Sequence, residues 1–176
     1  MSNDQHFIED LLEGVKSNQI SIDEAKAQLS HYDELGFAKI DLHRAKRQGF
    51  PEVIFGQGKT KEQIDTIITS LSQHHHVVLV TRINEEKANY VLDKHPYLEY
   101  HAEARIVCTP IASIQKSKNH ISVLCAGTSD LPVSEEAAIT AELMGITVKR
   151  YYDVGVSGIH RLFEHIHEIR QGKVSI

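Results

Sequence analysis

The stretch Ile121-Ser122-Val123-Leu124-Cys125-Ala126-Gly127-Thr128-Ser129-Asp130-Leu131-Pro132 decides the fold class. It begins as a buried strand, and Pro132 stands where the first turn of a helix accepts proline. A strand at 146–148 and a helix behind Ser157-Gly158 repeat the same order. This alternation predicts an α/β fold with parallel strands and right-handed crossovers.

The same pattern extends toward the N-terminus. Strands are expected at 53–55, 77–80 and 104–108, the second of them buried on both faces. Thr60 and Asn84 are expected to cap the helices that follow them. Residues 173–176 are expected to open one more strand. The sequence therefore predicts a three-layer α/β/α protein with parallel sheets, preceded by a helical segment.

Residues 1–35 are predicted to form an acidic helical hairpin, since they hold two lysines and eight acidic residues. Ser21 and Glu24 have the spacing of a capping box at the start of the second helix. The apolar side chains expected to face inward are Phe7, Ile8, Leu11, Leu12, Val15, Ile22, Ala25 and Leu29. The polar break at 116–119 then separates an N-terminal α/β domain, 36–115, from a second one, 116–176.

The composition is that of a water-soluble globular protein. The 176 residues carry a net charge of -5, with 41% hydrophobic and 24% charged residues. No apolar run is long enough for a membrane span, and no leader is recognised. Two cysteines make no disulfide framework, so a cytoplasmic protein is expected. The basic segment 38–61 lacks interleaved aromatic residues, which favours a small anion over a nucleic acid.

Two turns at predicted strand ends carry the strongest candidate site. In the first, Gly127, Thr128 and Ser129 can hold a phosphate through backbone N–H groups and hydroxyls, with Pro132 completing the set. Asp130 can accept hydrogen bonds from sugar hydroxyls. The alternative is an ordinary turn in which Asp130 caps the helix.

The second turn follows the neighbouring strand, and the carboxyl ends of neighbouring parallel strands share one edge of a sheet. Asp153 and His160 are the candidate catalytic residues, as bases or proton carriers. Gly155, Ser157 and Gly158 are the candidate substrate-binding residues. The alternative reading is that Ser157 caps the helix and His160 is merely solvated.

A third group is basic. His43, Arg44, Arg47 and Lys59 are candidate anion-binding residues, although a basic run of this kind is more often a solvated face. The run His74-His75-His76 has no carboxylate or thiol at ligand spacing, so no metal site is predicted.

Longer strings resemble a known family. Asp41-Leu42-His43-Arg44, the run from Arg47 to Gly56, and Gly58-Lys59-Thr60 look like the N-terminal signature of the LarB family. The run Ala126 to Val133, Glu135-Glu136-Ala137, and the run Asp153 to Arg161 look like its second half. The resemblance extends from about residue 36 to the end of the chain.

The resemblance implies a reaction in the biosynthesis of the nickel-pincer nucleotide cofactor of lactate racemase. The pyridinium ring of nicotinic acid adenine dinucleotide is carboxylated at C5, and its phosphoanhydride is hydrolysed to release AMP. CO2 or bicarbonate is the co-substrate, Mg²⁺ is allowed, and no cofactor is tightly bound. The second half is similar to phosphoribosylaminoimidazole carboxylase, a three-layer fold that forms octamers. Its phosphate and ribose loop corresponds to Gly127, Thr128, Ser129 and Asp130, and a homo-oligomer is implied.

One element of the family pattern is not found in the sequence. The thiol that LarB proteins are thought to use lies beyond a glycine-rich segment after the strand that begins at Val174. Neither Cys108 nor Cys125 matches it, so we expect a truncated LarB-type chain with an incomplete second domain. The alternatives are a nucleotide-binding module without chemistry and an aminoimidazole ribonucleotide carboxylase-like enzyme.

Overall fold

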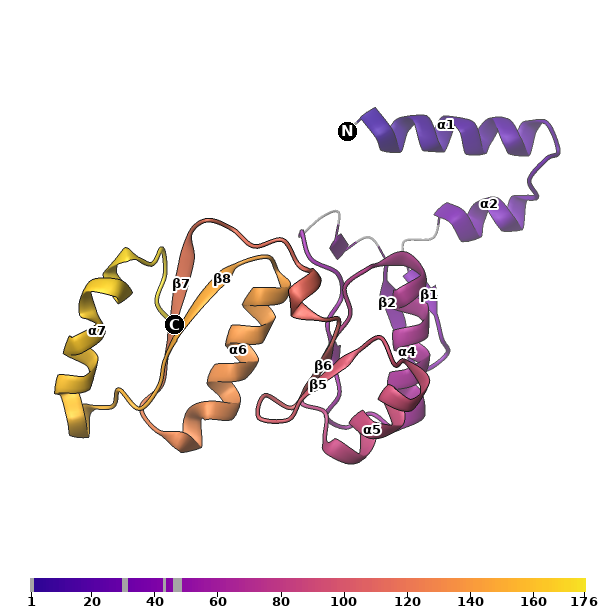
Figure 1. The fold of residues 1–176 in the computed structure, drawn as a ribbon. Coiled ribbons are helices and arrows are strands. Elements are labelled where there is room, and N and C mark those ends of the chain that lie inside the picture. The colour runs from indigo at the N-terminus through magenta and orange to yellow at the C-terminus, as the bar shows by residue number, and fades with distance from the viewer. Residues whose placement is uncertain (1, 30–31, 43, 46–48) are drawn as a thin grey trace.

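The structure is a computed structural model that describes residues 2–29, 32–42, 44–45 and 49–176. It is a mixed α/β fold with several small sheets, and none of the described sheets closes on itself (Figure 1). The helices are α1 (Ser2–Lys16), α2 (Ile22–Leu29), α4 (Lys61–His74), α5 (Glu85–Lys94), α6 (Leu131–Leu143) and α7 (Ile159–Gln171). The strands are β1 (Tyr32–Glu34), β2 (Lys39–Asp41), β3 (Ile54–Phe55), β4 (Leu79–Thr81), β5 (Glu99–His101), β6 (Ile106–Cys108), β7 (His120–Leu124) and β8 (Thr147–Tyr151).

The N-terminal hairpin forms as predicted but buries less of its apolar surface than expected. The Glu24 N–H donates to Ser21 Oγ over 3.1 Å, and the Ser21 N–H donates to Glu24 Oε2 over 2.8 Å, which confirms the capping box. Leu11 and Ala25 are buried, whereas Leu12 and Ile22 are 58% and 64% exposed. Figure 1 shows the hairpin set apart from the sheets, with α1 and α2 in contact with each other.

After the two-stranded β1–β2 sheet comes a four-stranded sheet, which is called the first sheet below. This first sheet is mixed, which corrects the prediction of parallel strands throughout. Its strand order is β3-β4-β6-β5, and only β3 and β4 run parallel. The cause is the short link 102–105 between β5 and β6, since so short a link joins antiparallel strands only. The predicted helix caps are confirmed: Thr60 accepts from the Gln63 N–H, and Asn84 accepts from the Lys87 N–H. Strand β4 is buried throughout, as expected.

The β7–β8 sheet, called the second sheet below, is parallel, and the last strand predicted at 173–176 is present as a short parallel bridge to β7. Strands β7 and β8 pair in register from His120 with Thr147 to Leu124 with Tyr151. Residues 173–176 lie on the other side of β7, where the Ile176 N–H donates to the Ser122 carbonyl over 2.9 Å. Helices α6 and α7 cover opposite faces of this sheet (Figure 1). Alternation along β7 agrees, because Ile121 and Val123 pack with α6 residues, and Leu124 packs with α7 residues.

The amphipathic pattern of 159–169 predicts that Ile159, Leu162, Phe163, Ile166 and Ile169 face inward, but α7 buries a narrower stripe. Ile169 is buried, whereas Ile159 and Phe163 are 43% and 61% exposed. The pattern of the helix behind Pro132 likewise predicts Val133 inward, and Val133 is 60% exposed. Among the described residues this sheet consists of β7, β8 and one bridge from Ser175 to Ser122, so it offers α7 a narrow surface.

Helix α6 is the element that joins the two sheets. Ala138 and Ala141 pack against Ile121 and Val123 of the second sheet. Ile139 and Leu143, on another side of the same helix, share a core cluster with Leu79, Ala104, Ile106 and Cys108 of the first sheet. A helix that is apolar on two sides is one that is buried on two sides. The core therefore continues across the exposed break at 116–119, and the domain boundary expected there stays a prediction.

Because α6 belongs to both cores, we expect Ile139→Ala to destabilise both at once. Large-to-small changes of this kind cost about 2–5 kcal/mol. Hydrogen exchange in increasing urea should show peptides from 79–108 and from 121–151 losing protection together. The control is Val133→Ala on the same helix, which should change stability by less than about 0.5 kcal/mol. Loss of protection confined to 121–151 would contradict a shared core.

Candidate functional site

The structure brings the two candidate turns together at the carboxyl ends of β7 and β8. The Val154 N–H donates to the Cys125 carbonyl over 3.1 Å, and the Cys125 N–H donates to the Tyr151 carbonyl over 3.1 Å. Gly155 lies against Ala126 so closely that a Cβ on it would stand 2.9 Å from the Ala126 carbonyl oxygen. The two turns therefore form one surface, which the sequence had placed at neighbouring strand ends.

In the first turn, Asp130 does not cap the helix. Its Oδ2 accepts from the Gly127 N–H over 3.1 Å, and its own N–H donates to the Gly127 carbonyl over 3.0 Å. These two bonds close a tight turn, Thr128–Asp130, ahead of α6. Thr128 and Ser129 are exposed at its tip, and in the described part of the chain their hydroxyls have no hydrogen-bond partner. Pro132 lies in the first turn of α6.

In the second turn, Asp153 adopts a left-handed backbone with φ of 58°. Arg161, in the first turn of α7, is ion-paired with its carboxylate. Gly155 and Gly158 are buried, and Ser157 is exposed without capping α7 through its side chain. His160 is exposed, and no hydrogen bond joins it to Asp153 among the described residues. The roles of these residues stay predictions.

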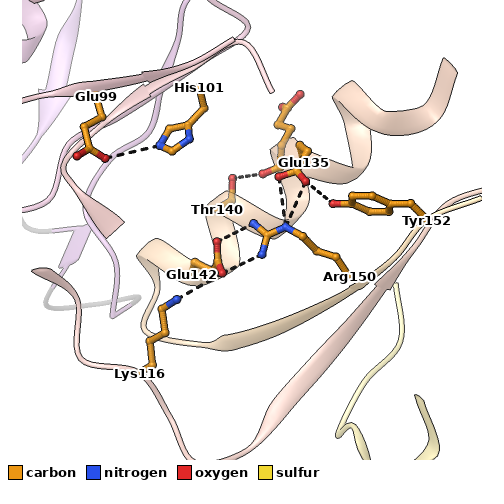
Figure 2. Close-up of polar contacts among 9 residues, drawn as sticks. Glu99, His101, Lys116, Glu135, Thr140, Glu142, Arg150 and Tyr152 are labelled. Atoms are coloured by element: carbon orange, nitrogen blue, oxygen red, sulfur yellow. Dashed lines mark hydrogen bonds and ion pairs between the residues drawn. The ribbon is translucent and has the colours of Figure 1, made fainter. Parts of the chain in front are cut away.

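A polar network that the sequence analysis missed joins β8 and Tyr152 to α6, next to this surface (Figure 2). Arg150 of β8 donates to both oxygens of Glu142 on α6, over 3.0 and 2.7 Å. Its Nε donates to Glu135 over 3.2 Å, and Tyr152 Oη donates to the same carboxylate over 2.5 Å. Lys116 Nζ lies 3.4 Å from Glu142. The network ties the end of β8 to the helix that follows the first turn.

The protonation states of the network follow from burial and charge. Burial by itself would raise the pKa of Glu142, but the hydrogen bonds and charges of Arg150 and Lys116 outweigh it, and the pKa is lowered. Burial and the bond to Glu135 raise the pKa of Tyr152. Glu142 is thus ionised and Tyr152 protonated at neutral pH. The signal in the sequence was spacing: Glu135 and Glu142 are seven residues apart on one helix, and Tyr152 follows Arg150 by two residues, just past the end of β8.

The basic candidates lie in the N-terminal half. His43 and Arg47 lie outside the described residues. Arg44 is half-buried, and Lys59 Nζ donates to the Phe55 carbonyl over 2.9 Å. Lys59 also lines a cavity of about 270 Å³ together with Ile54 and Ile67.

Both cysteines are core residues, as the sequence predicted. Cys108 is fully buried, and burial raises the pKa of its thiol to about 12. Cys125 is 7% exposed, and its Sγ points to the Gly127 carbonyl at 3.7 Å. The described residues contain no group of three histidine, cysteine or carboxylate side chains that could hold a metal ion. They also contain no helix of the length and apolarity that a bilayer crossing requires.

The chain is thus a mixed α/β protein in which two turns meet at the carboxyl ends of β7 and β8. Comparison with known families then places the chain: residues 32–111 match the family described as the LarB/PurE-like N-terminal domain. The chain thus carries a LarB/PurE-like N-terminal domain, and the family resemblance seen in the sequence is confirmed there.

The match extends further along one relative. The chain is 37% identical over 167 residues to an uncharacterized protein of Methanocaldococcus jannaschii. These residues cover 89% of this chain and 64% of the relative, so the chain spans less than two thirds of that protein's length.

The close contact between the two turns predicts that a side chain at Gly155 will destabilise the fold. In Gly155→Ala the new Cβ meets the Ala126 backbone, which cannot yield without moving the turn. We expect a loss of about 1–3 kcal/mol, measured by thermal or urea unfolding. Gly127→Ala is the matched control, because its φ is -160° and nothing lies within 4 Å of the new Cβ. Equal losses in both variants would show that the turns are not packed as described.

The network predicts a pH-dependent cost at Glu142. Since its pKa is lower in the folded chain, the ionised carboxylate stabilises the fold above its unfolded pKa of about 4.3–4.5. This stabilisation is lost as the pH falls through the folded pKa. We expect Glu142→Gln to cost about 2 kcal/mol at pH 7, shrinking toward zero in acid.

Urea unfolding of Glu142→Gln and the parent chain at several pH values measures this difference. Glu34→Gln is the control, because Glu34 pairs with Lys39 at an exposed position. It should change stability by less than about 0.5 kcal/mol. A cost at Glu142 that does not vary with pH would contradict an ionised, paired carboxylate.

Proposed function

We propose that this chain binds nicotinic acid adenine dinucleotide and belongs to the machinery that carboxylates its pyridinium ring and hydrolyses its phosphoanhydride. One observation carries the proposal: the turns Gly127–Asp130 and Asp153–Gly158 share one surface at the ends of two parallel strands. Ligands of open α/β sheets bind in that position. The LarB/PurE-like domain over 32–111 supplies the reaction class.

Each turn has a role in this proposal. The hydroxyls of Thr128 and Ser129 are exposed and unengaged, so they are available to a phosphate or a ribose. Asp130 holds the turn closed through the Gly127 N–H. The finer architecture proposed for 116–176 is a three-layer domain like that of phosphoribosylaminoimidazole carboxylase. The order β8, β7, 173–176, with helices on opposite faces, supports it.

The chemistry needs a nucleophile that this structure does not offer. A pyridinium carbon is electron-poor and does not attack CO2. A thiolate that adds to the ring turns it into a neutral enamine, whose carbon can form the new bond. A base then removes the ring proton, and the thiolate leaves to restore the aromatic ring. The thiol of Cys108 stays protonated and buried, and Cys125 is buried too, so neither is placed to add.

The base is proposed to be Asp153 or His160. Asp153 is held by Arg161 at the rim of the shared surface, while His160 is free to turn in solvent. Asp153→Asn separates the two, because asparagine tolerates the left-handed backbone and removes only the charge. If Asp153 is the base, this variant binds the dinucleotide but forms no product even with added thiol, under conditions in which the parent chain forms product.

Binding and chemistry are tested separately. We expect the 176-residue chain to bind nicotinic acid adenine dinucleotide in titration calorimetry, with about tenfold weaker binding in the double variant Thr128→Ala, Ser129→Ala. With bicarbonate and Mg²⁺ alone, mass spectrometry should detect neither AMP nor the biscarboxylated mononucleotide. Added 2-mercaptoethanol supplies a thiol, and both products should then appear.

Four outcomes would overturn parts of this proposal. Absence of binding refutes the substrate. Turnover without added thiol refutes the argument on Cys108 and Cys125. Binding with no product even in the presence of thiol favours the second candidate, a nucleotide-binding module without chemistry. The burial of both cysteines is the observation that favours this binding module as the second candidate. Preferential binding of aminoimidazole ribonucleotide would point instead to a plain carboxylase of that class.

A further inference from the structure

Two lysines surround the loop 56–60 that leads from β3 into α4. Lys59 Nζ donates to the Phe55 carbonyl over 2.9 Å. Lys87, on α5, reaches across and donates from Nζ to the Lys59 carbonyl over 2.6 Å. Both ammonium groups are therefore held at one loop by backbone oxygens. Each of these bonds uses one of the three N–H donors of its ammonium, and within the described ranges the other two donors of each have no hydrogen-bond partner.

These two charges differ from the other anchored lysines of the chain. Lys94, Lys116 and Lys149 each lie within 2.5 to 3.6 Å of a carboxylate. Lys59 and Lys87 have no carboxylate within 4.0 Å in the part of the chain that is described. A carbonyl dipole fixes an ammonium in place but leaves its charge uncompensated, so the loop presents two positive charges to an incoming anion.

The loop is also built to stay in place. Gly56 is packed so tightly that a Cβ would lie 2.9 Å from the Thr81 carbonyl oxygen, and Gly58 has a left-handed φ of 83°. Thr60 and Gln63 close the start of α4 with a capping box. Lys59 also lines a cavity of about 270 Å³, whose other charged lining residues are Lys39 and Glu52. The two charges therefore sit on a preformed support.

This loop and the nucleotide turns lie at the same end of the molecule. Strands β3 and β4 run parallel, so the loop 56–60 after β3 lies at the same end of its sheet as Arg82 after β4. The turns that follow β7 and β8 lie at the lower end of their sheet in Figure 1. A direct contact joins the halves there: Arg82, next after β4, pairs through Nε with Glu136 of α6 over 2.5 Å. Glu136 is in the second turn of the helix that follows Thr128 and Ser129.

We propose that Lys59 and Lys87 form a phosphate-binding site on the loop 56–60. The recognised chemistry is a phosphate or phosphoanhydride group, which accepts hydrogen bonds from ammonium groups and neutralises both charges. That group comes either from a free phosphate or from the second phosphate of the dinucleotide. Only the dinucleotide source rests on the function proposed above.

The test uses inorganic pyrophosphate as the first probe, titrated by calorimetry into the full chain. The double variant Lys59→Met, Lys87→Met keeps the length of the stems and removes both charges. We expect its affinity for pyrophosphate to fall about tenfold or more. Lys118→Met, Lys149→Met removes the same charge elsewhere and should leave the affinity within about threefold. Lys59→Arg, Lys87→Arg should retain binding, and thermal unfolding of each variant checks the fold.

The second arm titrates nicotinic acid adenine dinucleotide and nicotinic acid mononucleotide. If the methionine variant weakens the dinucleotide and spares the mononucleotide, the site takes the dinucleotide's second phosphate. If it weakens pyrophosphate alone, the site takes a free phosphate. Undiminished pyrophosphate binding in the methionine variant, or an equal loss in the control, overturns the site. Failure of dinucleotide binding with retained pyrophosphate binding would refute the proposed function and leave this site standing.

Discussion

The structure depends on the burial of one helix on two sides. Helix α6 gives Ala138 and Ala141 to the second sheet, and Ile139 and Leu143 to the first. The small residues allow the parallel strands to approach closely, and the larger ones fill the space toward Leu79 and Ile106. Because the same helix begins directly after the Gly127–Asp130 turn, its packing fixes that turn relative to both sheets.

Polar contacts add direction to this packing. Glu142 and Glu135 hold Arg150 from α6, and Tyr152 closes the network next to Asp153 (Figure 2). On the other side of the helix, Glu136 reaches Arg82. Apolar contact alone would let α6 slide along the strands, whereas charged pairs of fixed geometry define its position along its axis. The turns before α6 and after β8 are thereby held in register.

The sequence predicted local features well where a single residue pair determines them. The capping residues Ser21, Thr60 and Asn84, the buried strand β4, and the strand at 173–176 all follow from short patterns. The antiparallel pairing of β5 with β6 was missed because three-residue strands carry almost no periodicity. Exposure of Leu12, Ile22 and Phe163 was missed for another reason: an apolar stripe shows what a helix can bury, and only its neighbours decide what it does bury. The Arg150 network was missed because its members are far apart in sequence.

The Arg82–Glu136 pair links α6, which follows the Gly127–Asp130 turn, to the end of β4 in the other sheet. Any ligand that stabilises one arrangement of this helix stabilises the same arrangement for a ligand on the other sheet. Linkage requires the effect to be mutual: if an anion at the loop 56–60 strengthens nucleotide binding by some factor, the nucleotide strengthens anion binding by that same factor. Cooperativity between the two halves would therefore depend on how strongly each ligand favours one position of α6. It would require no direct contact between the ligands.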